Sequence, residues 1–223
     1  PPEAIGLDRS WGTFLPLYAL WCDEPGDGAT YTRLQELIAW TRECGGKLVG
    51  TLPLLPVFLG EDPFDPSPYA PVSRLFWNEF YCDVASYLQE GNLAAPLVTV
   101  ASERGTLLVD YAATWRQRRA ALATLAERLQ ADPERWSEIQ RWVEGRPAVQ
   151  LYARFRAAVD RYGPPSRWPE HLRRDRALDR PELQDEARIY LVGQWLASQQ
   201  LGASERSALY LDLPLGVHPE GFD

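Results

Sequence analysis

The sequence predicts an α/β fold whose strands are parallel. Residues 47–58 form a nearly unbroken apolar run, which is typical of a strand covered on both faces in a parallel sheet. A shorter apolar run at 13–20 precedes it, and an amphipathic pattern lies between the two. Strand, helix and strand within about forty residues make a βαβ unit, in which the two strands are parallel and the crossover is right-handed.

The first strand, over 13–20, is followed by the turn-forming sequence Pro25-Gly26-Asp27-Gly28. The helix after it has a signal at each end. Thr32 and Gln35 have the spacing of a capping box, and Gly45-Gly46 supplies a C-terminal stop. The second strand is therefore expected to begin directly after these two glycines.

The rest of the chain is mostly helical in pattern. Residues 60 to 105 carry few periodic signals, are rich in Pro, Phe, Trp and Tyr up to Tyr87, and far exceed an ordinary loop, so we expect a functional segment. The aromatic content argues against disorder. Helices are predicted over 111–129, 132–143, 148–161 and 183–201, and a third strand over 208–217.

This order of elements suits the first part of a (β/α)8 TIM barrel with a long aromatic-rich and helical insertion between strands 2 and 3. We assign residues 1–223 to barrel strands 1 to 3, with 60–182 as the loop and helical insertion. The three strands are expected to form an open parallel sheet, with the helix at 183–201 packed on its outer face.

The composition argues against two classes of binding partner, nucleic acids and membranes. The net charge of -8 and the pI near 4.9 argue against a nucleic-acid partner, because phosphate binding depends on clustered Lys and Arg. The one basic cluster, at 116–119, is expected to be a solvated helix face. No apolar stretch is long enough to cross a membrane and no secretory leader is visible, so we expect no membrane partner and a cytoplasmic location.

Cysteine and histidine usage predicts neither a disulfide framework nor a metal site. The three cysteines are odd in number and widely spaced, and the two histidines are too far apart in sequence for a helical metal pair. The positions concerned are Cys22, Cys44, Cys82, His171 and His218.

Tyr69 is the strongest single candidate for a binding residue. Pro66, Pro68 and Pro71 fix the backbone around it and hold the preceding residues out of the helical region. The ring of Tyr69 should therefore be presented on a stiff loop after the second strand, where α/β folds bind ligands.

Several blocks of the sequence, covering the chain from Gly6 onward, resemble the 4-α-glucanotransferases of glycoside hydrolase family 77, also called amylomaltases. The blocks occur in family order at residues 9–18, 50–55, 67–69 with 73–78, 194–196 with 199–201, and 210–217. The resemblance implies retaining transfer of α-1,4-glucan segments, with malto-oligosaccharides or starch-type α-glucans as substrates and no cofactor.

The resemblance also implies roles for individual residues. It places Tyr69 at the subsite that holds the glucose whose bond is cleaved, where an apolar sugar face can lie on the ring. Ser67 and Pro68 would frame that residue, Asp212 would support the site, and Trp77 would add aromatic surface. The alternative for Tyr69 is packing of its loop onto the barrel rim, and for Asp212 it is the capping of a nearby loop.

The catalytic residues themselves are expected outside this chain. In the family the nucleophilic aspartate, the acid/base glutamate and a third aspartate lie on later strands than the block at 210–217, so we predict no catalytic residue here. Five other carboxylates lie after predicted strands and could in principle do acid/base work, although solvated loop positions fit them better. These are Asp23, Glu24, Glu61, Asp62 and Asp65. Trp168 is a further aromatic residue to examine.

The sequence is compatible with three functional hypotheses. The first is the N-terminal part of the catalytic barrel of a 4-α-glucanotransferase, inactive alone and dependent on the rest of its barrel. The second is a non-catalytic glucan-binding or scaffold module, and the third is an unrelated parallel α/β enzyme. The chain opens on Pro1-Pro2 and has no Met, so we expect a processed or trimmed segment of a longer protein.

Overall fold

The computed structural model describes residues 10–20, 29–60, 62–90, 109–175, 178–202 and 208–223. The strands are β1 (Gly12–Phe14), β2 (Leu48–Thr51) and β3 (Leu209–Leu211). The helices are α1 (Tyr31–Glu43), α2 (Val84–Glu90), α3 (Tyr111–Ala131), α4 (Pro133–Glu144), α5 (Pro147–Tyr162), α6 (Glu170–Asp175) and α7 (Gln184–Gln200), joined in places by short 3-10 turns. Asp23, Glu24 and Glu61, named above as candidates, lie outside the described residues.

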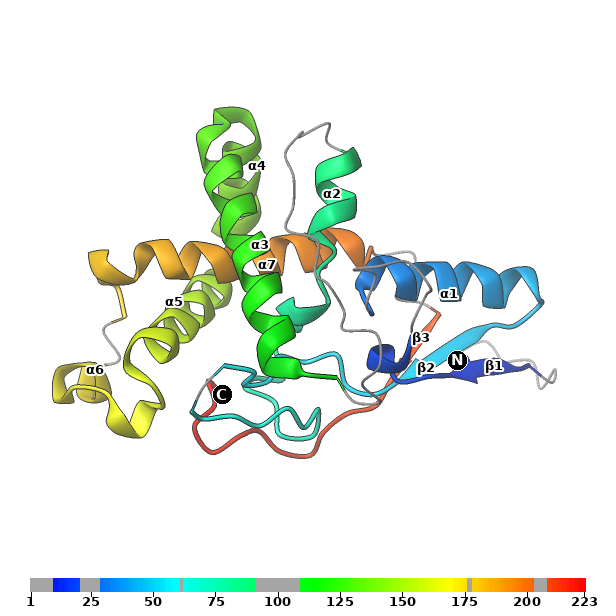
Figure 1. The fold of residues 1–223 in the computed structure, drawn as a ribbon, viewed down its shortest axis with the longest axis horizontal. Helices are drawn as coiled ribbons and strands as arrows, with labels where there is room; N and C mark the ends of the chain where they lie inside the picture. The colour runs from blue at the N-terminus through cyan, green and yellow to red at the C-terminus, as the bar shows by residue number, and fades with distance from the viewer. Residues whose placement is uncertain (1–9, 21–28, 61, 91–108, 176–177, 203–207) are drawn as a thin grey trace, which may run out of the picture.

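The strands form one parallel sheet in the order β1-β2-β3 (Figure 1). Gly12 to Phe14 pair with Leu48 to Gly50, and Val49 to Thr51 pair with Leu209 to Leu211. This register brings the carboxyl ends of all three strands to one edge of the sheet. The expected open, three-stranded parallel sheet is confirmed.

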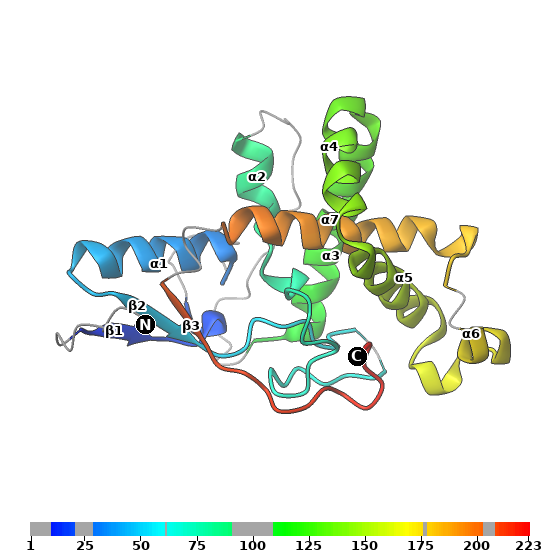
Figure 2. The same cartoon turned by 180° about the vertical axis from the view of Figure 1, so that it is seen from behind.

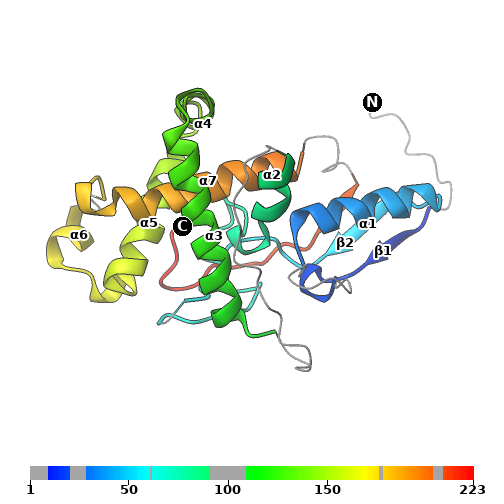
Figure 3. The same cartoon turned by 45° about the horizontal axis from the view of Figure 1, so that its top comes forward.

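Helix α1 covers one face of this sheet, as Figure 3 shows. Thr30 caps its first turn by accepting a hydrogen bond from the Arg33 N–H at 3.3 Å, so the predicted capping box at Thr32 and Gln35 is wrong by two residues. The helix ends at Glu43, and Gly45 follows with a φ of 86°, a conformation that suits glycine.

The opposite face of the sheet is uncovered in the described part of the chain. Paired residues project to the same face, and Phe14, Leu48 and Tyr210 are 60%, 44% and 66% exposed on this one. Val49, on the face under α1, is 1% exposed. Within β2, Val49, Gly50 and Thr51 are buried, so the prediction that the second strand is covered on both faces is wrong only at Leu48.

The helices between β2 and β3 form the larger part of the core. Figure 2 shows α4 and α6 reaching away from the sheet, while α7 runs through the centre. Helix α7 packs mainly against α5 and α3, which differs from the expectation that it would lie on the outer face of the sheet. Its buried residues come from most of its circumference, because α5, α3 and the segment before α2 surround it.

The lengths of two strands and the presence of two short helices differ from the sequence prediction. The third strand, predicted over 208–217, spans only Leu209–Leu211 and is followed by Pro214, which has no N–H for a ladder. The first strand ends at Phe14, and a 3-10 turn over Leu17–Ala19 follows Pro16, which has no N–H for the ladder. Helices α2 and α6 were not predicted, since each is short and offers too few turns for a periodic signal.

The basic cluster is not a simple solvated face. Arg118 donates hydrogen bonds to the carbonyls of Ala29 and Phe80, and Arg119 pairs with Asp160 at 2.8 Å. Burial lowers the pKa of Arg118 to about 10, which still leaves a cation at neutral pH. Both side chains therefore join α3 to other elements.

Among the described helices, none is long and apolar enough to cross a bilayer.

Candidate functional site

The loop after β2 is built around Tyr69 by its own side chains. Asp65 Oδ1 accepts a hydrogen bond from the Ser67 N–H at 2.9 Å, and Ser67 Oγ accepts one from the Tyr69 N–H at 3.3 Å. The Asp65 N–H in turn donates to the carbonyl of Phe58. These local turns, together with the prolines, fix the backbone and leave Tyr69 50% exposed. Asp65 is thus a structural carboxylate of the loop.

The structure brings Tyr69 and Asp212 together, although 143 residues separate them in the chain. The Tyr69 hydroxyl donates to Asp212 Oδ2 at 2.6 Å. Asp212 directly follows β3, and its N–H donates to the Thr51 carbonyl at the end of β2 at 3.3 Å. The partner that a half-buried carboxylate needs is therefore the Tyr69 hydroxyl, and this hydrogen bond to Asp212 raises the pKa of the Tyr69 phenol.

The C-terminal segment runs beside the same loop. The His218 N–H donates to the Pro71 carbonyl at 2.8 Å and the Phe222 N–H donates to the Val72 carbonyl at 2.7 Å. The carboxylate of Asp223 accepts hydrogen bonds from the Ser73 hydroxyl and from the Arg74 N–H. These contacts clamp the far end of the loop that carries Tyr69.

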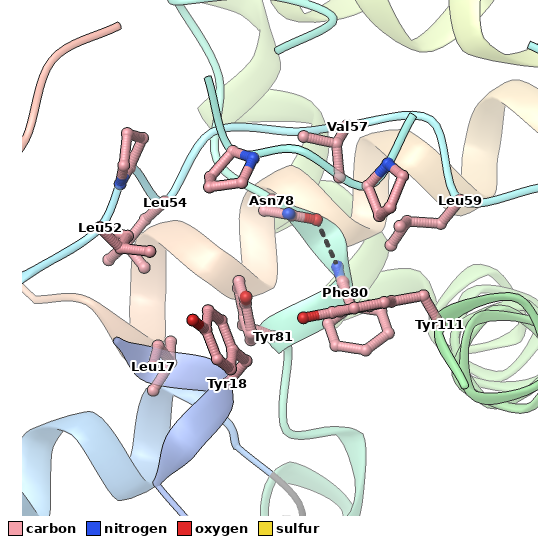
Figure 4. Close-up of a pocket in the computed structure, with 13 residues that line it drawn as sticks. Leu17, Tyr18, Leu52, Leu54, Val57, Leu59, Asn78, Phe80, Tyr81 and Tyr111 are labelled. Carbon is pink, nitrogen blue, oxygen red and sulfur yellow. Dashed lines mark hydrogen bonds between the residues drawn. The ribbon is translucent and has the colours of Figure 1, made fainter. Parts of the chain in front are cut away.

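A pocket lies next to this loop, at the carboxyl ends of β1 and β2. Pro66 and Pro68 from the loop form part of its lining, and Figure 4 shows Tyr18, Phe80, Tyr81 and Tyr111 grouped in it. The remaining lining is Leu17, Leu52, Pro53, Leu54, Val57, Leu59 and Asn78. Aliphatic and aromatic walls with a few polar groups suit a ligand that has both apolar and hydroxyl surfaces. Sequence reasoning missed Tyr18, Tyr81 and Tyr111 as site residues, because nothing local distinguishes them from other aromatic residues.

Segment 77–83, which supplies Asn78, Phe80 and Tyr81 to the pocket, is held from behind by helix α7. The Trp77 N–H donates to Gln194 Oε1 at 3.0 Å, and Gln194 Nε2 donates to the Trp77 carbonyl at 2.6 Å. Trp77 is half-buried and packs against the core. Trp168, the other tryptophan singled out, is 4% exposed, and its ring N–H donates to the Gly163 carbonyl, so it belongs to the core.

A buried pair of charges lies beside this contact. Glu79 and Arg156 are 1% and 4% exposed and approach within 3.8 Å, and Gln194 Nε2 also donates to Glu79 Oε1 at 2.7 Å. Burial raises the pKa of Glu79, and the nearby Arg156 opposes that rise. Charges this deep need partners, so the pair and the Gln194 hydrogen bond tie α5 and α7 to segment 77–83, and loss of either charge would leave the other uncompensated.

The described residues contain no cluster of His, Cys, Asp and Glu that could hold a metal ion. Asp62 lies on the surface and pairs with Arg167 at 2.6 Å. The ion pair of Asp62 with Arg167 and the hydrogen bond from the Ser67 N–H to Asp65 favour loop positions for both carboxylates.

Comparison with known proteins gives one consistent result. The sequence profile described as 4-alpha-glucanotransferase, glycoside hydrolase family 77, matches residues 15–223. The 4-alpha-glucanotransferases of Mycobacterium bovis and Mycobacterium tuberculosis are each 29% identical to the chain over 250 residues. These alignments cover 100% of this chain and 34% of the relatives, so the chain spans about a third of their length.

Solved structures agree at the level of the fold. The amylomaltase from Streptococcus agalactiae in complex with acarbose superposes with a TM-score of 0.79 at 20% identity, covering 96% of this chain and 45% of that one. The amylomaltase from Corynebacterium glutamicum gives a TM-score of 0.74 at 19% identity, covering 96% of this chain and 31% of that one.

Proposed function

The chain belongs to glycoside hydrolase family 77, the 4-α-glucanotransferases, and from that premise we propose that its parent protein transfers α-1,4-glucan segments between malto-oligosaccharides. The observation that carries the proposal beyond family membership is the contact between Tyr69 and Asp212 at the carboxyl end of the sheet. The acarbose complex of the streptococcal amylomaltase supports a glucan as the ligand. The cytoplasmic location expected from the sequence is part of this proposal.

The sheet is proposed to be the first three strands of a (β/α)8 barrel, with residues 1–223 in the first part of the catalytic domain and 60–182 as the insertion. The uncovered face with Phe14, Leu48 and Tyr210 supports this, because the inner face of a barrel is filled only when all of its strands are present. In that arrangement the later strands of the parent would cover it.

Five residues are proposed to contact the sugar or to support the surface that receives it. Tyr69 offers its exposed ring to the apolar face of a glucose unit, while Ser67 and Pro68 hold the ring in place. Asp212 fixes the phenol through its hydroxyl and leaves the ring face free for stacking. Trp77 is proposed to support the wall of the adjoining pocket through its backbone.

The chemistry itself is proposed to come from carboxylates on later strands of the parent. A retaining transfer needs one carboxylate that attacks the anomeric carbon and a second that protonates the departing oxygen, and these lie about 5 to 5.5 Å apart. The glycosyl group then passes to the 4-hydroxyl of another glucan, which gives its proton back to the second carboxylate. This chain contributes binding surface to that cycle.

Activity of the full-length parent on maltotriose tests the proposal, with glucose release and the appearance of longer oligosaccharides as readouts. We expect both products from the parent and none from the 223-residue chain alone. The rival reading, a glucan-binding or scaffold module, predicts that the parent binds maltotriose and produces neither. Turnover by the isolated chain would contradict the placement of the catalytic groups outside it.

A further inference from the structure

We propose that Gln194, far from the sheet on helix α7, is a positioning residue for glucan binding, acting through segment 77–83. The inference rests on the proposed function of the parent enzyme. It concerns helix α7, which, like α4, α5 and α6, contributes no residue to the described lining of the pocket.

Two glutamines on α7 hold the two ends of the segment in the same way. Gln194 exchanges a pair of hydrogen bonds with the backbone of Trp77. Gln200 does the same at Asp83, where Oε1 accepts from the Asp83 N–H at 2.9 Å and Nε2 donates to the Asp83 carbonyl at 2.7 Å. Each glutamine satisfies one backbone donor and one backbone acceptor, as a neighbouring strand would.

The residues between the two contacts are the ones that line the pocket. Asn78, Phe80 and Tyr81 all belong to its wall, and both ends of this short stretch are held by α7. The Asn78 N–H donates to the Leu54 carbonyl at 2.9 Å, and the Tyr31 hydroxyl donates to the Asn78 carbonyl at 2.8 Å. The wall is thereby fixed between α7 on one side and the segment after β2 on the other.

The close approach of α7 to the segment is independent evidence for the same role. A Cβ added at Gly193 would lie 2.8 Å from Glu79 Cγ, so only glycine permits this spacing. The Cys82 Sγ also donates to the Gly193 carbonyl at 3.3 Å. Gln194 and Gly193 therefore set both the position and the distance of the wall.

The wall is connected to the candidate sugar site through the loop that carries Tyr69. Pro66 and Pro68 of that loop line the same pocket as Phe80 and Tyr81. Tyr18, which also lines the pocket, lies close enough to Tyr69 to contribute to the rise in its pKa, after the larger effect of Asp212. A shift of segment 77–83 should therefore change how the loop and pocket receive a glucan.

The test uses the full-length parent and compares KM with kcat for maltotriose. In Gln194→Met the backbone of Trp77 loses its two hydrogen bonds to Gln194, and Glu79 loses one. We expect KM to rise about ten-fold while kcat changes less than about two-fold. Gln200→Met, at a half-buried position in the last turn of α7, should give a smaller rise of the same kind if the first variant does not fold.

Tyr190→Phe is the matched control, since Tyr190 lies one turn earlier on the same helix. It loses the hydroxyl hydrogen bonds to Asp160 at 2.8 and 3.0 Å, which do not involve segment 77–83, and it keeps the ring that lies under Arg156. We expect this variant to lower the melting temperature and to leave KM unchanged.

A raised KM in the glutamine variants with an unchanged KM in Tyr190→Phe supports the positioning role. Two outcomes would overturn the positioning role and leave Gln194 as a stabilising residue. One is a wild-type KM in every variant, and the other is an equal rise in KM in the glutamine variants and in Tyr190→Phe. An inactive wild-type parent would instead refute the proposed function, so the two failures are distinguishable.

Discussion

The hydrogen bond between Tyr69 and Asp212 can be tested by a double-mutant cycle in the full-length parent. Tyr69→Phe removes the hydroxyl and keeps the ring, while Asp212→Asn keeps the shape of the acceptor and removes its charge. If the 2.6 Å contact orients the ring for sugar stacking, each single change should lower kcat/KM, and the second should add little once the first has been made.

The distance and exposure of the pair set the size of the effect. A hydrogen bond to a charged partner typically shifts an equilibrium by ten-fold or more, and water around a half-exposed ring weakens it. We therefore expect a loss of about three- to ten-fold for each single variant and about the same loss for the double variant. Tyr69→Ala removes the ring as well, and by analogy with base stacking it should cost roughly ten- to hundred-fold.

Glucose release from maltotriose is the assay, with kcat/KM taken from initial rates below KM. A larger loss for Tyr69→Ala than for Tyr69→Phe identifies stacking as the main role of the ring. Strictly additive losses for Tyr69→Phe and Asp212→Asn would show that the contact does not orient the ring. Wild-type activity in Tyr69→Ala would return Tyr69 to a role in packing its loop.

Three further predictions concern stability, measured by denaturant unfolding and melting temperature. Arg156→Met should destabilise the protein by about 3–5 kcal/mol at pH 8, because Glu79 is left buried without its cation. The loss should be smaller at pH 5 than at pH 8. Arg156 holds down the pKa of Glu79, which burial raises, so without Arg156 that pKa rises further and more of the buried carboxyl is protonated, and therefore uncharged, at low pH. A pH-independent loss, or the same pH dependence in Glu79→Gln/Arg156→Met, would contradict this. Gly12→Ala should open the pairing of β1 with β2, since its Cβ would lie 2.2 Å from the Leu48 carbonyl oxygen, whereas Gly60→Ala, with open space around it, serves as the neutral control. Thr30→Ala should cost about 1 kcal/mol through the lost helix cap, and a wild-type melting temperature would argue against that cap.

The sequence alone predicted the long helices and the parallel pairing of the strands, because the signals for both act between neighbouring residues or elements. The four long helices between β2 and β3 were predicted to within about three residues at each end, because capping residues, proline and apolar periodicity act over neighbouring residues. The order of strand, helix and strand also fixed the parallel sheet, since a short βαβ unit allows few other arrangements. The family followed from short blocks that can be recognised without coordinates.

The sequence predicted two residues of the candidate site, Tyr69 and Asp212, but not the contact between them. The prolines showed that Tyr69 stands on a stiff loop, and the family resemblance placed Asp212 in support of the site. That each is the other's partner depends on the register of β3 against β2, which places Asp212 beside the end of the second strand. No local property of either residue encodes that register.

The tertiary structure alone decided which side chains act on distant backbone. Gln194 and Gln200 lie in blocks that carry the family resemblance, but the sequence does not show what their amides contact. Only the approach of α7 to segment 77–83 makes them partners of the backbone. Arg118 was expected to be solvated for the same reason, although its guanidinium joins α3 to the carbonyls of Ala29, just before α1, and of Phe80. Sequence patterns report which face of an element is apolar, whereas the polar contacts across elements depend on packing distances that arise only when the whole chain is folded.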